Sequence, residues 1–256
     1  MRIVIDTHTH SVASGHAYST LGELAEAAAA KGLEGFVLTD HGPSMPGGAH
    51  PWHFGNLRVL PSRISGVRFW KGIEANIIDH EGGIDLVESE LARLDFVLAG
   101  FHEVCFASGS REENTRALLA ALANPWVDAI SHPGNPAFPV DLSAVVRAAL
   151  KEGKALEINN SSFTIRRGSD ANCLEIARLS AEAGGRLVVG SDAHFHGDVG
   201  NFSKALAVID KAGVSENLVM NSDLAGFEAF LAERAAARSK FVLRALPASY
   251  VEVVQA

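Results

Sequence analysis

The sequence predicts a single-domain α/β fold of the barrel type, with about seven strands. The chain of 256 residues has the length of one α/β barrel. Short apolar runs alternate with amphipathic stretches from end to end, as in a parallel sheet with helices on both faces. The runs recur about every 30 residues, the size of one strand–helix unit. An open doubly wound sheet is the alternative, but no glycine-rich phosphate loop follows any run.

The predicted strands are short, mainly apolar runs, each followed by polar residues. They cover residues 3–5, 35–39, 67–73, 96–100, 127–131, 155–158 and 187–190. The first helix is expected to begin after Ser19 or Thr20, either of which can cap it, and to end at Gly32. Further helices are expected near residues 111–123, 141–152, 170–183 and 202–212. The polar segment 42–66, rich in proline and glycine, is predicted to be a lid or a binding loop.

The composition disfavours several classes of protein. A formal net charge of −8 argues against a broad nucleic-acid-binding surface. Two cysteines, Cys105 and Cys173, cannot build a disulfide framework, which favours a reducing, cytoplasmic setting. The N-terminal residues MRIVIDTHTH contain only a short apolar run, so neither a signal peptide nor a membrane span is predicted. The sequence does not indicate an oligomeric state.

The chain has 11 histidines, and most of them follow the predicted strands. The strand-end groups are His8, His10, His16, His41, Glu74, His102, His132, Asp192 and His194. In a closed parallel barrel all the carboxyl ends of the strands lie on one face, so these side chains are expected to converge there. Imidazole and carboxylate are ligands of zinc, manganese and iron. Nine such groups are too many for one ion and suit two or three, with a bridging carboxylate.

Three further residues are candidates for contact with a substrate. Arg166 and Arg167 follow the sixth predicted strand, and one of them is expected to bind phosphate; a surface salt bridge is the alternative. His53 lies beside Trp52 in the polar segment. It is expected either to touch the substrate or to belong to a surface aromatic cluster.

Other polar residues near the strand ends are kept out of the ligand set. Asp6 and Asp40 precede candidate ligands and are expected either to orient an imidazole or to form a strand-end hydrogen bond. Glu157 is omitted because its phase in the strand can direct it elsewhere. His80 and His196 are expected to be solvated loop residues.

The motif series HTH, TDHG, GIEAN, GFHE, SHPGNP, LEINNSS and GSDAH resembles the PHP (polymerase and histidinol phosphatase) family, and most closely its YcdX-like phosphatases. The resemblance extends from residue 3 to about residue 231. It implies a distorted (β/α)7 barrel, similar to a TIM barrel, over residues 1–238. Residues 239–256 form a C-terminal tail without a recognisable motif.

The resemblance also implies a trinuclear metal centre, usually of zinc, with manganese or iron as other candidates. The first ion would take His8, His10, Glu74 and Asp192 as its ligands. Glu74 would bridge to a second ion, which His102 and His132 complete. The third ion would take His16, His41 and His194. Glu74 and Asp192 are the predicted catalytic carboxylates.

The predicted reaction is hydrolysis of a small phosphomonoester by a hydroxide that bridges two metal ions. One alternative is another metallohydrolase of the amidohydrolase type, but no predicted strand ends in the lysine that often bridges metals there. A second alternative is a nuclease or non-catalytic PHP module. The acidic net charge and the absence of a polymerase domain disfavour it. The sequence identifies neither the alcohol of the substrate nor the general acid.

Overall fold

The computed structural model describes residues 1–245 and shows the predicted parallel sheet. Seven parallel strands follow one another in chain order around the sheet. They are β1 (Ile5–Thr9), β2 (Gly35–Leu38), β4 (Val67–Asn76), β5 (Phe96–Gly100), β6 (Ala129–Ile130), β7 (Ala155–Asn159) and β8 (Arg186–Gly190). A short strand, β3 (Arg63–Ile64), pairs with β4 in antiparallel orientation. The predicted fold class, an α/β barrel with seven strands, is confirmed.

The barrel is nearly closed between β1 and β8, and backbone and side-chain hydrogen bonds complete the closure. Near the carboxyl ends, the backbone N–H of Asp192 donates to the carbonyl of His8 at 2.9 Å. Nearer the amino ends of β1 and β8, the side chain of Asn221 replaces the backbone hydrogen bonds that would pair the two strands. Its Nδ2 donates to the carbonyl oxygens of Ile5 (2.8 Å) and Val189 (2.7 Å), and its Oδ1 accepts from the N–H of Val189 (3.0 Å). One buried amide thus satisfies the backbone groups of both edge strands.

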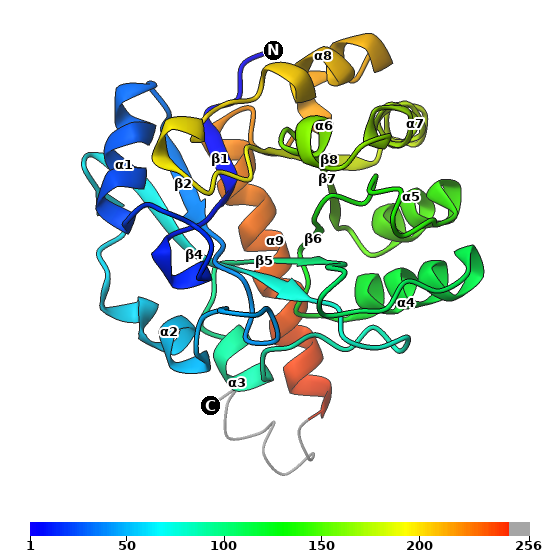
Figure 1. The fold of residues 1–256 in the computed structure, drawn as a ribbon, viewed down its shortest axis with the longest axis horizontal. Coiled ribbons are helices and arrows are strands. Elements are labelled where there is room, and N and C mark those ends of the chain that lie inside the picture. Colours follow the sequence, from blue (N-terminus) through cyan, green and yellow to red (C-terminus); the bar gives the residue numbers. More distant parts are fainter. Residues whose placement is uncertain (246–256) are drawn as a thin grey trace.

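Helices surround the sheet, as Figure 1 shows. The long ones are α1 (Leu21–Ala30), α4 (Arg111–Ala123), α5 (Leu142–Lys151), α7 (Ser169–Ala183) and α8 (Ser203–Ala212), close to their predicted bounds. Thr20, rather than Ser19, caps α1: its hydroxyl accepts from the N–H of Glu23, and Glu23 bonds back to Thr20. Gly32 follows the helix with φ of 69°, a conformation that favours glycine.

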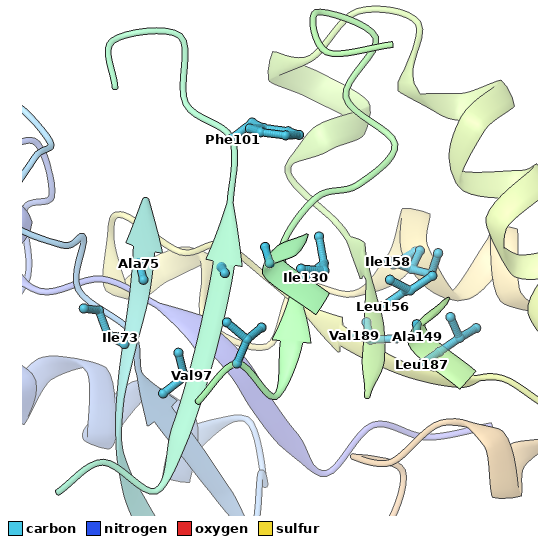
Figure 2. Packing of buried hydrophobic residues seen from close by; sticks show 14 of the residues in the cluster. Ile73, Ala75, Val97, Phe101, Ile130, Ala149, Leu156, Ile158, Leu187 and Val189 are labelled. Atoms are coloured by element: carbon cyan, nitrogen blue, oxygen red, sulfur yellow. The ribbon is translucent and has the colours of Figure 1, made fainter. Parts of the chain in front are cut away.

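The main core lies between the sheet and these helices. Figure 2 shows Val97, Ile130 and Ile158 from successive strands in this layer. Alternate residues of the strands point into the barrel instead. In its lower half this interior is apolar, and Val37, Leu98 and Val188 belong to it. The upper half, at the carboxyl ends of the strands, is polar.

The segment 42–66 is more ordered than a plain loop. It contains α2 (Pro51–Asn56), a 3₁₀ turn, η2 (Leu57–Val59), and β3. Pro51 stands at the first turn of α2, where its missing N–H costs nothing, and the His50 side chain accepts from the N–H of Trp52 at 3.1 Å. Pro51, one of the prolines behind the loop prediction, therefore marks a helix start.

The remaining short helical elements lie in the segments that join the strands and the long helices. They are η1 (Val12–Ser14), α3 (Glu88–Leu91), α6 (Ser162–Ile165), η3 (His196–Asp198) and η4 (Glu216–Leu218). η1, α6 and η3 lie in loops that leave the carboxyl ends of β1, β7 and β8. These are the loops that border the candidate site.

A long helix, α9 (Leu224–Ala245), covers the amino-terminal end of the barrel and passes behind β5 in Figure 1. Phe227 packs edge-on against Trp70, with ring centroids 5.1 Å apart, and also contacts Phe96. The helix continues without a break through the expected domain boundary at residue 238. Residues 246–256 of the predicted tail lie outside the described residues. Among the helices of residues 1–245, none combines the length and apolar character needed to span a membrane.

Candidate metal centre

The structure brings all nine strand-end residues together on the carboxyl face of the barrel. Glu74, on β4, lies within 3.5 Å of five imidazoles, those of His8, His10, His41, His102 and His132. Asp192, after β8, lies within 3.6 Å of the rings of His8, His10 and His194. His16 joins the cluster through His194, with their Nε2 atoms 3.1 Å apart.

Glu74 stands at the centre and is 1% exposed. Its two carboxylate oxygens face different imidazoles. Oε1 lies 2.7 Å from Nε2 of His132 and 3.3 Å from Nε2 of His102. Oε2 lies 2.9 Å from Nδ1 of His41, 3.2 Å from Nε2 of His8 and 3.5 Å from Nε2 of His10. A carboxylate divided in this way has the geometry of a bridging ligand.

Three groups of side chains have donor atoms close enough to share a cation. They are His8, His10 and Glu74; His41, Glu74 and His102; and His10, His41 and His194. Within each group the donor atoms all lie within 4.8 Å of one another. The groups overlap in His10, His41 and Glu74, so they form one continuous cluster rather than three separate sites. His16, more exposed, stacks on His41 with ring centroids 5.0 Å apart.

The hydrogen bonding of this cluster fits metal ligands. Nε2 of His8, Nε2 of His10, Nδ1 of His41 and both ring nitrogens of His102 are buried without a hydrogen-bond partner among the described residues. Buried polar atoms in folded proteins are nearly always satisfied. Unpartnered imidazole nitrogens gathered around two carboxylates therefore match the donor set of divalent cations.

The electrostatics agree with this assignment. Burial, followed by the charges of His41 and His194, lowers the pKa of His10 well below its ordinary value. Burial and the charge of Arg166 lower the pKa of His132 to about 4. Burial raises the pKa of Glu74, but the neighbouring imidazoles outweigh it and hold that pKa well below the usual range. Neutral His10 and His132 beside an ionised Glu74 are in the protonation states that bind metal. His8 differs: burial lowers its pKa, but the charges of Glu157, Glu74 and Asp192 outweigh burial and raise that pKa well above its ordinary value, so a bound cation would have to displace its proton.

The backbone is strained at two of the nine residues. His132 and Asp192 have φ of 34° and 58°, in the left-handed region that non-glycine residues rarely adopt. The strained residues follow β6 and β8, where they turn the chain so that the side chains point into the cluster. Strain of this kind collects at functional sites, where the surrounding structure holds it.

Asp40 orients part of the cluster through a serine. Its Oδ1 accepts from the Oγ of Ser14 at 2.7 Å, and that Oγ lies 3.1 Å from Nδ1 of His10. Its Oδ2 lies 3.1 Å from Nε2 of His53. His53, 27% exposed on its side chain, thus links α2 to the ligand shell, a contact that the sequence did not indicate. Asp6 instead accepts backbone N–H groups, including that of Ser191 at 3.0 Å.

Arg166 is fixed beside the cluster, whereas Arg167 is exposed. Nη1 of Arg166 lies 3.2 Å from Oδ2 of Asp192 and 3.1 Å from Oγ of Ser162. Both arginines line a groove of about 420 Å³, which is also bordered by His102 and which we call the arginine groove. The structure therefore places both arginines at the edge of the cluster, in different environments.

Glu157 belongs to the site, although the sequence analysis left it out. It is fully buried, and its Oε1 accepts from Nδ1 of His8 at 2.7 Å. The signal was present in the alternation along β7: Leu156 and Ile158 face the core, so the residue between them faces the interior. His80 and His196 were predicted to be solvated, but both are partly buried. His80 packs on Phe106, and the hydroxyl of Ser19 lies 3.2 Å from Nδ1 of His196.

The fold and the cluster together define a class of protein: a seven-stranded α/β barrel with a histidine- and carboxylate-rich metal-binding site at the carboxyl ends of its strands. Residues 6–161 match the family model of the PHP domain. The chain therefore belongs to the PHP domain family, as its motifs indicated.

Relatives share most of the chain. A probable phosphatase of Thermoanaerobacter sp. (strain X514) is 52% identical over 236 residues, which cover 91% of this chain and 96% of that protein. A probable phosphatase of Shewanella sediminis is 48% identical and covers the same shares. The predicted enzyme class, a phosphatase, is thus the one that these relatives carry in their names.

A solved structure supports the fold. The histidinol phosphate phosphatase of Lactococcus lactis subsp. lactis, determined with zinc, L-histidinol and phosphate, superimposes with a TM-score of 0.62 at 22% identity. The match covers 84% of this chain and 95% of that one. It establishes the same barrel architecture in a second protein.

Proposed function

We propose that this protein is a metal-dependent phosphatase that hydrolyses a small phosphomonoester at a centre of three divalent ions, with zinc as the main candidate and manganese or iron as alternatives. The observation that carries the proposal is the position of Glu74, whose two oxygens face separate sets of imidazoles, four of which have a buried ring nitrogen without a partner. The names of the relatives support the phosphatase class.

The nine residues divide among three ions as follows. His8, His10, Glu74 and Asp192 would hold the first ion, Glu74 with His102 and His132 the second, and His16, His41 and His194 the third. The overlap of His10 and His41 between groups of donor atoms is compatible with closely spaced ions. Bound there, the ions would activate a water molecule and offset the charge that develops on the phosphate.

Arg166 is our candidate for binding the phosphate of the substrate. Asp192, Asn159 and Ser162 hold its Nη1 atom, so the guanidinium enters the arginine groove in one orientation. A fixed guanidinium loses little freedom when it binds an anion, and its fork of N–H groups matches phosphate oxygens. Arg167, at the exposed side of the groove, would contribute a weaker attraction.

Asp192 combines two roles in this proposal. Its Oδ2 accepts from Nη1 of Arg166 and from Nδ2 of Asn159, which fixes the carboxylate. Its Oδ1 faces His8 and His10, so this oxygen would hold the first ion with them, next to the reacting phosphate. Glu74, enclosed by imidazoles, orders the cluster instead.

His53 and the cellular setting complete the proposal. Nε2 of His53 bonds Asp40 while a quarter of the side chain stays exposed, so it can contact a substrate that enters over α2. Cys105 and Cys173 are both unpaired, which supports a reducing, cytoplasmic setting. The overall charge of −8 favours a small substrate over nucleic acid.

A substrate comparison tests the proposed reaction. Metal-loaded protein would be given p-nitrophenyl phosphate, a panel of phosphorylated metabolites, single-stranded DNA and an amide or lactone substrate. We expect release of inorganic phosphate from monoesters, and loss of that release in Glu74→Gln. Hydrolysis of DNA alone, or of the amide or lactone alone, would replace the proposal with one of the two alternatives.

A further inference from the structure

Glu157 is a buried carboxylate to which the proposed reaction gives no role. It lies in the middle of β7 and is fully shielded from solvent. Its neighbours Leu156 and Ile158 belong to the core between sheet and helices, and both are labelled in Figure 2. Burying a charge is costly unless it is paired or hydrogen-bonded, so its surroundings define what it does.

One oxygen of Glu157 fixes the ring of His8. Nδ1 of His8 lies 2.7 Å from Oε1, and because a carboxylate only accepts, Nδ1 must carry the hydrogen. The other nitrogen, Nε2, lies 3.2 Å from Oε2 of Glu74 and would offer its lone pair to a cation bound between them. A carboxylate behind an imidazole sets its tautomer and increases its basicity as a metal ligand.

The other oxygen fixes the backbone of His132. Oε2 accepts from the backbone N–H of His132 at 2.8 Å and from Nδ2 of Asn159 at 3.1 Å. His132 is the residue with φ of 34°, so this bond holds a strained peptide. In that conformation Nε2 of His132 comes within 2.7 Å of Oε1 of Glu74.

The neighbouring strand leaves room for this carboxylate. Gly190, paired with Asn159 across β7 and β8, faces Glu157. A Cβ atom at Gly190 would lie 2.3 Å from Oε1 of Glu157 and 2.5 Å from Cβ of His8. Glycine at this position is therefore required for Glu157 and His8 to meet.

We propose that Glu157 is a positioning residue that holds His8 and His132, and through them two of the metal sites, in their binding geometry. The inference rests on the proposed function, because it takes both histidines as metal ligands. Glu157 itself contacts neither the substrate nor a metal in this account. A single carboxylate thereby couples ligands that are 124 positions apart in the sequence (132 minus 8).

The test is Glu157→Gln, with metal affinity rather than activity as the main readout. The amide offers one acceptor oxygen where the carboxylate offers two, so its NH₂ group must face either the N–H of His8 or that of His132. We expect zinc affinity, measured by competition with a chromophoric chelator, to fall by about 10- to 100-fold. The control is Asp128→Asn, another fully buried carboxylate, outside the cluster; it should keep the wild-type zinc affinity.

A measurement on the unmodified chain keeps the inference testable if the variant does not fold. Long-range ¹H–¹⁵N NMR spectra of zinc-loaded protein report which ring nitrogen of each histidine carries the hydrogen. We expect His8 to carry its hydrogen on Nδ1; a hydrogen on Nε2 alone would overturn the inference. Wild-type affinity in a folded Glu157→Gln would also overturn it and leave the proposed function intact. A wild-type protein that binds no zinc, manganese or iron would instead overturn both.

Discussion

The two ends of the barrel both bury charged groups, but they balance them differently. At the amino-terminal end, Asp128 is fully buried between Arg234 and Arg238 of α9 and also accepts from the N–H of Val97 at 2.9 Å. The carboxylate there has protein cations as partners. At the carboxyl end, Glu74 and Asp192 are surrounded mainly by imidazoles, several of which have buried nitrogens without a partner.

This difference distinguishes a structural site from a binding site. The buried carboxylate at the amino-terminal end is neutralised by cations of the chain itself, so that end can attach α9 without a ligand. The carboxyl end has donors and negative charge in excess of its own cations, and a divalent ion would resolve both. Burial of charge alone would not distinguish the structural site from the binding site, because both ends bury charged groups.

Glu74→Gln should have the largest effect and should act only at the carboxyl end. Removing a charge that faces five imidazoles should lower kcat/KM for a phosphomonoester by at least about 10³-fold, the order seen when electrostatic stabilisation is lost at a reacting centre. Steady-state kinetics and circular dichroism would be measured together. Near-wild-type activity would remove Glu74 from the centre.

Asp128→Asn should have the opposite pattern. Loss of the carboxylate leaves two buried guanidinium groups without their counter-charge, at a cost of about 3–5 kcal/mol in the free energy of unfolding. Urea unfolding at saturating zinc measures the cost, and kcat per folded molecule should stay within twofold. A stable variant with impaired activity would contradict the division between the two ends.

Lys154 makes the amino-terminal end sensitive to pH. Its ammonium, 2% exposed, donates to the carbonyl of Asn124; burial, followed by the charge of Arg234, lowers its pKa to about 7. The unfolded chain, with a lysine pKa of 10.5, binds more protons above pH 7, so folding stability contributed here rises with pH between about 7 and 10.

Comparison with Lys154→Met isolates this effect. Wild-type stability should gain on the variant by up to about 1.4 kcal/mol per pH unit between pH 7 and 10, and by nothing below pH 6. Urea unfolding at several pH values measures the difference. Parallel stability curves would mean that Lys154 is protonated in the folded protein throughout.

Arg167→Ala should have the smallest effect. The guanidinium is exposed, and an exposed charge contributes only about 0.2–1 kcal/mol, so KM should rise by less than about fivefold. Arg166→Ala, by contrast, removes a fixed cation and should lower kcat/KM by about 10- to 100-fold. Equal losses in the two variants would place both arginines on the substrate.

Much of the fold could be predicted because the strands are apolar on both faces. An apolar run such as residues 96–100 fits a buried parallel strand. The polar residue after each run indicates the end of the barrel at which the candidate site lies. The first helix also carried its own capping signal in Thr20 and Glu23. Local sequence is sufficient to predict an element where its residues are favourable in only one kind of environment.

The rest depends on contacts between distant segments. The role of Asn221 in closing the barrel requires knowing that β1 and β8 lie together. His53 meets Asp40 only because α2 folds back over the carboxyl face. Glu157 was misjudged for a different reason: its alternation with Leu156 and Ile158 was readable, but a carboxylate inside a barrel is informative only beside His8 and His132.

Metal content measured alongside activity tests the central claim most directly. Purified protein would be analysed by inductively coupled plasma mass spectrometry while its phosphatase activity is followed through chelation and restoration with zinc, manganese or iron. The account predicts three ions per chain in the active protein, loss of activity as they are removed, and recovery when they return. Full phosphatase activity in protein shown to contain no metal would contradict it.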